Sequence, residues 1–309
     1  MWYWFFGLLF SVMALVGNAL IILLIIFKPC LRTSTNCLIV SLAVSDFFAA
    51  LSYFPVICIS NFFHKIDLSH AGIWYKVCFT FIYCSTTNLC VLTADRYLAV
   101  VKPLKYATFT SSKTSRQNIL ILTGWITPLI FFTLPALFSY QGNDVFTLVF
   151  EANRILTFQV YPCIFFLLVI FRLLCIVRGM RRQEIILTHQ LSYNRAIYSQ
   201  SPTTGFNQPS RPESRTSMMI ILLLIFFNIT FAGGNYICYC FVLKTCVVHL
   251  TVKKIIYLLY IVNLAVNPIV YAFFKKDIRR ATLGLMKRKI TAINRRTAPY
   301  NSWSSSDQL

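Results

Sequence analysis

Seven long apolar stretches, separated by polar segments, constrain this chain more than any other feature. About 20 apolar residues in a helix are enough to cross the hydrocarbon core of a bilayer. Charged residues make up only 12% of the chain, against about 25% in soluble domains. The sequence therefore predicts an all-α membrane protein, a bundle of seven transmembrane helices. Within a few residues, the spans are expected at 4–27, 36–60, 73–100, 117–138, 154–178, 216–242 and 252–274.

The positive charge predicts how the chain lies across the membrane. A net charge of +20 would suit a nucleic-acid binder, but Lys and Arg occur in short clusters between apolar stretches, so no nucleic-acid partner is expected. With the N-terminus outside, 23 of the 29 Lys and Arg residues fall on the cytoplasmic side. We therefore expect an extracellular N-terminus and a cytoplasmic C-terminus. The run from Phe5 to Phe27 is long enough to remain as a membrane anchor.

The polar segments near the C-terminal half have distinct compositions. The stretch from Gln183 to Arg215 is rich in Ser, Thr, Asn and Pro, and is expected to be a flexible cytoplasmic loop. Apolar and basic residues alternate at helical spacing over 275–286, which predicts a short amphipathic eighth helix at the membrane surface. We therefore expect one membrane domain over 1–286 and a disordered cytoplasmic tail over 287–309.

Asp46 lies in the middle of the second span, where a charge costs about 2.5–3.5 kcal/mol or more and needs partners. Two interpretations follow. The carboxylate and neutral oxygens around it hold a small hard cation such as sodium, or they form a hydrogen-bonded packing node without an ion. The partners expected around Asp46 are Asn18, Ser85, Asn263 and Asn267, the last two on one helical face.

Two further sequence motifs lie at the cytoplasmic ends of spans. Asp95-Arg96-Tyr97 ends the third span, although an arginine that extends from a helix end to the interface gives the same pattern. Pro268, within Asn267-Pro268-Ile269-Val270-Tyr271, interrupts the seventh span and frees a carbonyl that an Asn or water must satisfy.

Together and in this order, these motifs resemble those of the rhodopsin-like (class A) family of G-protein-coupled receptors. The resemblance implies a plasma-membrane receptor that passes an extracellular signal to a heterotrimeric G protein through outward movement of span 6. It extends over nearly the whole chain and rests on Gly17-Asn18, Leu42-Ala43-Val44-Ser45-Asp46, Ser85, Asp95-Arg96-Tyr97, Pro103, Trp125, Pro162 and Asn267-Pro268-Ile269-Val270-Tyr271.

The resemblance also implies roles for single residues. Arg96 is expected to be the pivot, held inactive by Asp95 and by Glu213 at the inner end of span 6. Tyr271 is expected to rotate inward on activation, and the Ser-rich tail suits arrestin and a receptor kinase. The expected switch comprises Asp95, Arg96, Tyr97, Glu213, Asn267, Pro268 and Tyr271, and the expected sodium site Asp46, Ser85, Asn263 and Asn267; no cofactor is expected apart from an allosteric sodium ion.

Several positions depart from the family pattern. Phe231-Ala232-Gly233 replaces the usual Trp and Pro of span 6, so any bend there is expected from Gly233-Gly234. Ile170 stands where a Tyr is common, and Ile278 replaces the usual Phe of the final helix. These changes leave open a receptor-like protein with weak or no G-protein coupling.

The family disulfide cannot form in this chain. Its position on span 3 is Ala71, and the loop 139–153 has no cysteine. Cys78 is therefore expected to be unlinked. The thiols of Cys238, Cys240 and Cys246 are expected to be free rather than paired with one another.

The ligand pocket implied by the family lies in the outer half of the bundle. Cys78 stands where amine receptors carry an Asp, and Ile261 where opsins carry a Lys, which disfavours the first class and excludes the second. Arg154 and Lys253 at its mouth suit an anionic or lipid-like ligand or a peptide C-terminus, unless they are interface anchors outside it. The implied pocket residues are Cys78, Phe79, Ile82, Arg154, Phe158, Phe231, Asn235, Cys238 and Tyr257.

Two other classes of membrane protein compete with a receptor. An enzyme is not expected, because no His lies within a span and no cluster has the spacing of metal ligands. An ion-coupled transporter would use Asp46 with Asn263 and Asn267 as its ion site, but the internal repeat that transporters show is missing.

Overall fold

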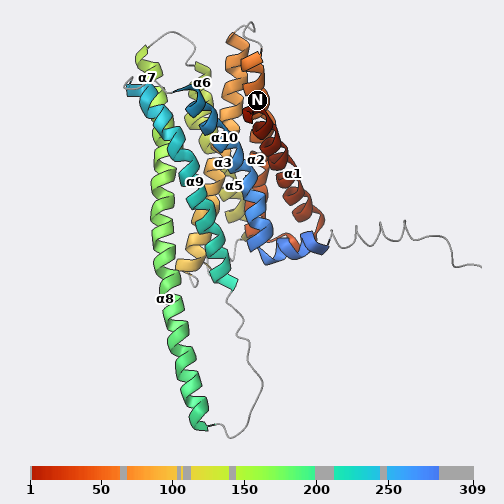
Figure 1. The fold of residues 1–309 in the computed structure, drawn as a ribbon, viewed down its shortest axis with the longest axis vertical. Coiled ribbons are helices and arrows are strands. Elements are labelled where there is room, and N and C mark those ends of the chain that lie inside the picture. The colour runs from red at the N-terminus through yellow and green to blue at the C-terminus, as the bar shows by residue number, and fades with distance from the viewer. Residues whose placement is uncertain are drawn as a thin grey trace, which may run out of the picture.

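The computed structural model describes residues 2–62, 68–102, 106, 113–138, 144–198, 212–243 and 249–284. Throughout these ranges the regular structure is helical, and seven helical segments are long and apolar enough to cross a membrane. They pack side by side as an elongated bundle (Figure 1). The predicted seven-span helical fold is therefore confirmed.

The first three spans are single helices. A short 3₁₀ turn, η1 (Pro29–Leu31), joins α1 (Trp2–Phe27) to α2 (Ser34–Phe62). The third span is α3 (Leu68–Val101). The last two spans, α9 (Pro212–Leu243) and α10 (Leu250–Phe274), are also single helices, and α9 passes through its two adjacent glycines without interruption.

The fourth and fifth spans each contain one π-helical turn beside a proline. In the fourth span, η3 (Leu129–Thr133) precedes Pro135, and in the fifth, η4 (Leu156–Val160) precedes Pro162. A proline lacks the N–H of a regular helix, and a π turn is one way in which the backbone accommodates this loss. The fourth span thus consists of α5 (Lys113–Pro128), η3 and α6 (Leu134–Phe138), and the fifth of α7 (Asp144–Ile155), η4 and α8 (Tyr161–Tyr198).

The helix α8 is much longer than the sequence predicted. It runs well past the end of the bundle (Figure 1) and reaches Tyr198, so a loop beginning at Gln183 is wrong for residues 183–198. None of these residues is Gly or Pro, and a helix that is already formed in the membrane propagates at little cost. The rest of the expected loop, 199–211, lies outside the described residues.

A short helix over 276–284 follows α10 and lies across the base of the bundle (Figure 1). Its buried residues are Ile278 and Ala281, 0% and 8% exposed, which face the bundle. Nζ of Lys28 donates to the carbonyl of Ala281 over 3.1 Å and joins this helix to the end of α1. The expected amphipathic eighth helix is therefore present.

The helices α1 and α10 pack closely at the proline of α10. A Cβ at Gly17 would lie 2.7 Å from Cγ of Pro268, so only glycine allows this approach. Pro268 has no N–H for the carbonyl of Leu264, four residues earlier. Nδ2 of Asn18 donates to that carbonyl over 3.1 Å, so an Asn satisfies the freed group, as the sequence indicated.

Candidate functional site

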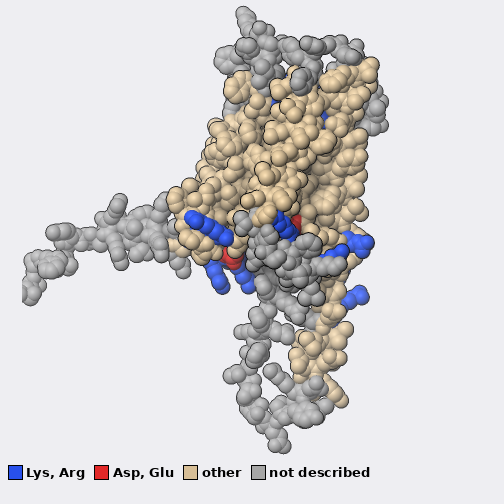
Figure 2. Space-filling model, turned by 180° about the vertical axis from the view of Figure 1, so that it is seen from behind, with Lys and Arg blue, Asp and Glu red and all other residues tan. Residues whose placement is uncertain are grey.

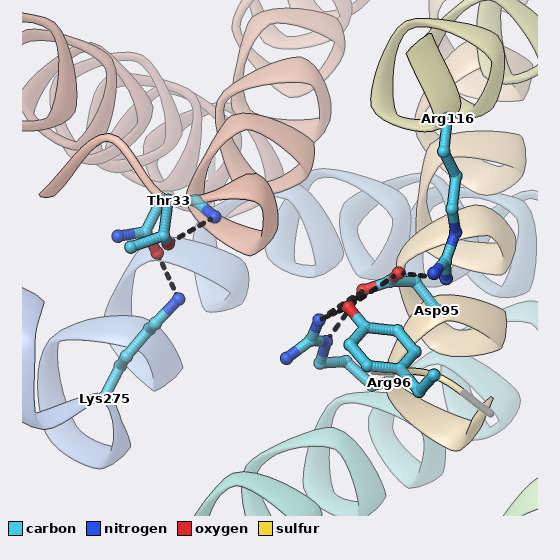
Figure 3. A network of polar contacts seen from close by, with 7 residues as sticks. Thr33, Asp95, Arg96, Arg116 and Lys275 are labelled. Carbon is cyan, nitrogen blue, oxygen red and sulfur yellow. Dashed lines mark hydrogen bonds and ion pairs between the residues drawn. The ribbon is translucent and has the colours of Figure 1, made fainter. Parts of the chain in front are cut away.

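A charged network occupies the inner end of α3 (Figure 3). Asp95 is 2% exposed, yet two guanidinium groups contact its carboxylate. Arg96 donates to Oδ2 from Nε over 3.0 Å and also from Nη2, and Nη2 of Arg116 on α5 donates to Oδ1 over 2.9 Å. Two cations on one buried carboxylate make Asp95 the centre of this network.

Tyr106, which follows α3 in the chain, completes the network. Its hydroxyl accepts from Nη2 of Arg96 over 2.9 Å and donates to Oδ1 of Asp95 over 3.2 Å. The guanidinium carbon of Arg116 lies 4.6 Å from the centre of its ring, within cation–π range. Burial raises the pKa of the Tyr106 hydroxyl above its usual value, which keeps it protonated as a donor. Sequence reasoning missed Tyr106, because no motif marks it.

Two further predicted switch residues, Tyr97 and Tyr271, are at least half-buried. Tyr97 is half-buried and packs against the hydrophobic core. Tyr271 on α10 is 0% exposed, and its hydroxyl has no hydrogen-bond partner within the described part of the chain. A buried hydroxyl left unpaired is costly. The backbone of Glu213 belongs to α9, but its side chain lies outside the described residues.

Asp46 is 0% exposed and joins three helices. Oγ of Ser85 on α3 donates to its Oδ1 over 2.5 Å, and Nδ2 of Asn267 on α10 donates to its Oδ2 over 2.7 Å. Asn263 donates over 2.8 Å to Oγ1 of Thr230 on α9 instead. Asn18 is engaged by backbone carbonyls, as described above.

Within the described part of the chain, the carboxylate of Asp46 has no cationic partner. The ion pairs found among the described residues involve Asp95 or Glu151. A buried carboxylate that receives only neutral hydrogen bonds keeps an uncompensated charge. This site could hold a small cation through its carboxylate and the oxygens of neighbouring side chains.

An aromatic cluster fills the bundle at the other end of α3. The buried ring of Tyr83 stacks on Phe158 of η4 with centroids 4.5 Å apart and meets the edge of Phe132 at 4.7 Å. Phe79 lies 5.8 Å from Tyr83. Cys78 and Ile82 are buried beside them on α3, 1% and 5% exposed. The sequence did not single out Tyr83, which is at the centre of this cluster.

Other predicted pocket residues extend this aromatic region towards α9 and α10. Phe231 stacks on Phe227 with centroids 3.9 Å apart, and meets Tyr260 edge-on at 5.0 Å. Tyr53 of α2 lies 6.4 Å from both Tyr260 and Tyr257. Tyr53 and Tyr260 are therefore further residues of this region that sequence reasoning missed.

The position of the Tyr260 hydroxyl requires a glycine on α9. A Cβ at Gly234 would lie 1.7 Å from this oxygen and 2.8 Å from the ring carbon that carries it. The absence of a side chain at Gly234 is thus what lets the tyrosine reach the α9 backbone.

Arg154, expected at the mouth of the pocket, is directed into the bundle. Nη1 donates to the hydroxyl of Tyr83 over 2.7 Å, and the guanidinium forms an ion pair with Glu151 one helical turn earlier. Its charge is therefore balanced within the chain. On α9, Nδ2 of Asn235 lies 3.7 Å from Sγ of Cys163, and the side chain of Cys238 lies outside the described residues.

The cysteines differ from the expectation in one case. Cys78 is a free buried thiol, as predicted. Cys240 is disulfide bonded, which corrects the prediction of a free thiol at this position. Its partner lies outside the described side chains, and apolar surroundings alone do not reveal whether two thiols meet.

Comparison with known proteins gives a consistent result. Residues 17–271 match the model of the 7 transmembrane receptor (rhodopsin family). Octopamine receptor beta-2R of Chilo suppressalis is 25% identical, with 89% of this chain and 76% of the relative aligned. For 5-hydroxytryptamine receptor 7 of Xenopus laevis the identity is 24%, over 94% of this chain and 78% of the relative. Melanopsin-B of Gadus morhua is 30% identical, but over only 43% of this chain and 22% of its own length.

These relatives are receptors rather than enzymes, and the family match covers most of the chain, including Asp46, the Asp95 network and Pro268. Seven membrane-capable helices and receptor relatives identify a multi-pass protein of the plasma membrane. The chain belongs to the rhodopsin family of seven-transmembrane, G-protein-coupled receptors.

Proposed function

We propose that this protein is a ligand-activated receptor in which Arg96 is released to a heterotrimeric G protein when the inner end of α9 moves outward. The observation that carries the proposal is the engagement of Arg96 by Asp95 and Tyr106. In this arrangement the side chain of Arg96 is only 15% exposed, and its Nε and Nη2 atoms donate to Asp95 and Tyr106. A G protein would have to compete with these contacts.

The network has the physical character of a switch. Its carboxylate and guanidinium groups can remain paired with each other, or Arg96 can exchange Asp95 and Tyr106 for acceptors on a partner. A ligand shifts such an equilibrium only by binding one arrangement more tightly than the other. Arg116 would stay on Asp95 in the active state and so limit the cost of freeing Arg96.

The distribution of charge supports an intracellular position for this end of the bundle. Most of the visible Lys and Arg side chains gather near the base (Figure 2), at the end where the Asp95 network lies. Positive residues are enriched on the cytoplasmic side of membrane proteins. The proposal thus places the N-terminus outside, the C-terminus inside and the aromatic cluster towards the extracellular face.

The proposed ligand is apolar or aromatic and carries no amine cation. The octopamine and serotonin receptors similar to this chain are named for amines. Here Cys78 is a buried thiol and offers no charge to an ammonium group. The carboxylate of Glu151 forms an ion pair with Arg154. This arginine therefore has no unbalanced positive charge to attract an anionic ligand. Aromatic rings on α3, η4 and α9 provide the remaining contact surface.

We also propose an allosteric sodium ion at Asp46. Burial without a cationic partner supports this site, since a buried carboxylate gains most from a small hard cation. Asp46 and the oxygens of Ser85 and Asn267 would hold the ion. A hydrogen-bonded node without an ion remains the alternative.

The experiment is nucleotide exchange on purified heterotrimeric G proteins by the full-length receptor in lipid nanodiscs, with and without a panel of apolar, carboxylate and amine compounds. Exchange above that of empty nanodiscs, enhanced by an apolar compound, supports the proposal. A folded receptor that activates no class of Gα would indicate a receptor-like protein without coupling. Ion-driven uptake of isotope into receptor vesicles would instead indicate a transporter. Arrestin and kinase binding to the tail can be measured on the same samples.

A further inference from the structure

Lys275 is the corner residue between α10 and the short helix that follows it. Its backbone N–H donates to the carbonyl of Tyr271 over 3.0 Å, and its carbonyl accepts from the N–H of Arg279 over 2.9 Å. The first of these bonds ends α10, and the second belongs to the short helix over 276–284. The backbone of Lys275 is therefore fixed from both sides, which limits where its side chain can reach.

The ammonium group of Lys275 is held by a neutral side chain. Nζ donates to Oδ1 of Asn36 near the start of α2. Asn36 is 0% exposed, and its Nδ2 donates to the carbonyl of Leu31 over 2.6 Å, which fixes the orientation of the amide. The ion pairs found within the described ranges involve Asp95 or Glu151 and none includes Lys275. A half-buried cation thus has an amide oxygen where a carboxylate would balance its charge.

The nearest effective charge to Lys275 is also positive. Figure 3 shows Lys275 on one side and the Asp95 network, with Arg96, on the other. The charged groups that act on Lys275 are Arg96 of α3 and Asp277 of the short helix, and the effect of Arg96 is the larger. Burial, together with the charge of Arg96, lowers the pKa of Lys275 to about 8, so most of the lysine is still charged at pH 7. The two cations therefore repel each other.

This repulsion depends on whether Arg96 is paired. In the structure, the carboxylate of Asp95 accepts from Nε and Nη2 of Arg96, so Lys275 faces a neutralised guanidinium. A released Arg96 would keep its charge but lose this partner, because Arg116 would retain Asp95. Like charges repel more strongly when neither is paired, and the effect is larger at a partly buried site than in bulk water. The charge of Lys275 consequently favours the paired arrangement of Arg96 over the released one.

We propose that Lys275 is a positioning residue of the switch, whose positive charge keeps Arg96 on Asp95 until a partner supplies other acceptors. This role depends on the release of Arg96 proposed above. It adds a repulsive restraint to the attractive contacts with Asp95 and Tyr106. The restraint lies at the end of α10 rather than on α3, so a movement of the inner end of α10 would carry Lys275 with it and change the restraint.

The test is basal nucleotide exchange by the full-length receptor in lipid nanodiscs, with purified G protein and no ligand, at pH 7. Lys275→Met should raise exchange by up to about fivefold, the range expected for a partly exposed pair of charges. Lys275→Arg keeps the charge and should leave exchange near that of the unmodified receptor. Exchange in Lys275→Met equal to that of the unmodified receptor would overturn the proposal.

The matched control is Lys276→Met, which removes the same charge from the neighbouring, exposed position. It should leave basal exchange unchanged. An equal rise in Lys276→Met and Lys275→Met would show that the overall charge of the base restrains the switch, and this would overturn a specific role for Lys275.

A pH series separates charge from packing. Exchange by the unmodified receptor, relative to Lys275→Met, should rise as the pH increases through about 8, because Lys275 then loses its proton. In Lys275→Arg the ratio should stay low, since an arginine remains charged. A ratio that does not change with pH in the unmodified receptor would mean that Lys275 acts through packing alone, contrary to the proposal.

Fluorine NMR separates this restraint from coupling itself. A fluorotyrosine introduced at position 106 reports the hydrogen bonds of its hydroxyl to Asp95 and Arg96 at pH 7 without any G protein. In Lys275→Met a second resonance should gain population. This change without nucleotide exchange would contradict the proposed coupling but support the restraint, whereas an unchanged spectrum would overturn the restraint. If Lys275→Met does not fold, Lys275→Gln, which is neutral and can still donate to Asn36, takes its place in both measurements.

Discussion

The hydroxyl of Tyr106 bridges the two charged members of the switch, since it donates to Asp95 over 3.2 Å and accepts from Arg96 over 2.9 Å. It therefore supports the pair as a donor to the carboxylate and as an acceptor from the guanidinium. Tyr106 lies beyond the end of α3, so a residue outside the spans takes part in holding this switch.

Tyr106→Phe should raise basal nucleotide exchange by up to about fivefold. The ring remains over Arg116, but Asp95 and Arg96 each lose a hydrogen bond, and such a bond is worth about 1 kcal/mol. Exchange of labelled GTP in receptor membranes without ligand measures the change. Tyr193→Phe, at an exposed position of α8, is the control and should leave exchange unchanged. Lower basal exchange in Tyr106→Phe would contradict a restraining role.

Arg96→Ala should abolish G-protein activation while the receptor still reaches the cell surface. The argument is that Arg96 contacts the G protein directly in the active state, whereas Asp95 retains Arg116 as a partner in the folded receptor. Nucleotide exchange and surface labelling of the same cells separate coupling from folding. Exchange equal to that of the unmodified receptor would rule out this role for Arg96.

Gly234→Ala should destabilise the receptor by about 1–3 kcal/mol, because the new Cβ would overlap the hydroxyl of Tyr260. Thermal unfolding in detergent gives the change. Tyr260→Phe removes the overlapping oxygen, so the two changes combined should cost less than their sum. Gly179→Ala on α8, where a Cβ meets nothing within 4 Å, is the control and should not destabilise. Additive effects of Gly234→Ala and Tyr260→Phe would argue against the overlap.

Asp46→Asn should abolish any dependence of agonist affinity on sodium. The carboxylate is the only formal negative charge in the proposed oxygen cluster, and a hard cation needs it. Agonist binding in sodium and in N-methylglucamine buffers, at equal ionic strength, makes the comparison. Asn263→Ala, which removes a contact to Thr230 rather than to Asp46, is the matched variant and should retain the sodium effect. If the unmodified receptor does not respond to sodium, the packing node without an ion is the better interpretation.

The stability of the receptor should rise as the pH increases from about 8 to 10.5, through Lys275. Burial, together with the positive charge of Arg96, lowers the pKa of Lys275 from 10.5 to about 8. In this window the unfolded chain holds a proton that the folded receptor has released, so the free energy of unfolding increases with pH. Below pH 8 both states are protonated and the slope from this residue vanishes.

Thermal unfolding of the receptor and of Lys275→Met, at several pH values between 7 and 10.5, isolates this contribution. The difference in stability between them should shift towards the unmodified receptor as the pH rises. Nζ of Lys275 donates to Oδ1 of Asn36, which is itself 0% exposed, and this contact positions the lysine in its buried environment (Figure 3). A difference that does not change with pH would mean that Lys275 keeps its ordinary pKa.

The spans and their order were predictable because lipid permits few solutions. Every backbone group within the bilayer needs an internal partner, so a long apolar run must be a helix. The same reasoning predicted that the carbonyl freed by Pro268 would find an Asn, and Asn18 fills that role. Burial of Asp46 with donors from other helices follows equally from the cost of a charge in lipid.

The polar contacts around Asp95 and Arg154 were not predictable from the sequence. Tyr106 and Arg116 are 11 and 21 residues from Asp95 in the chain, and nothing in their spacing marks them as its partners. Arg154 was expected at the mouth of a pocket, but sequence alone does not tell whether a long side chain turns inward to Tyr83. The continuation of α8 was missed because polar composition suggested a loop, whereas helix propagation depends on the absence of Gly and Pro.

The hydrogen bond from Nδ2 of Asn18 to the carbonyl of Leu264 couples the first helix to the last. The two residues are 246 positions apart, yet their contact replaces one that is local in an unbroken helix. If the inner half of α10 pivots at Pro268, the amide of Asn18 must either detach or travel with it. A receptor produced without residues 1–27 would therefore lose more than a membrane anchor. Its last helix would expose an unbonded carbonyl to lipid at its weakest turn, where no water replaces the missing amide.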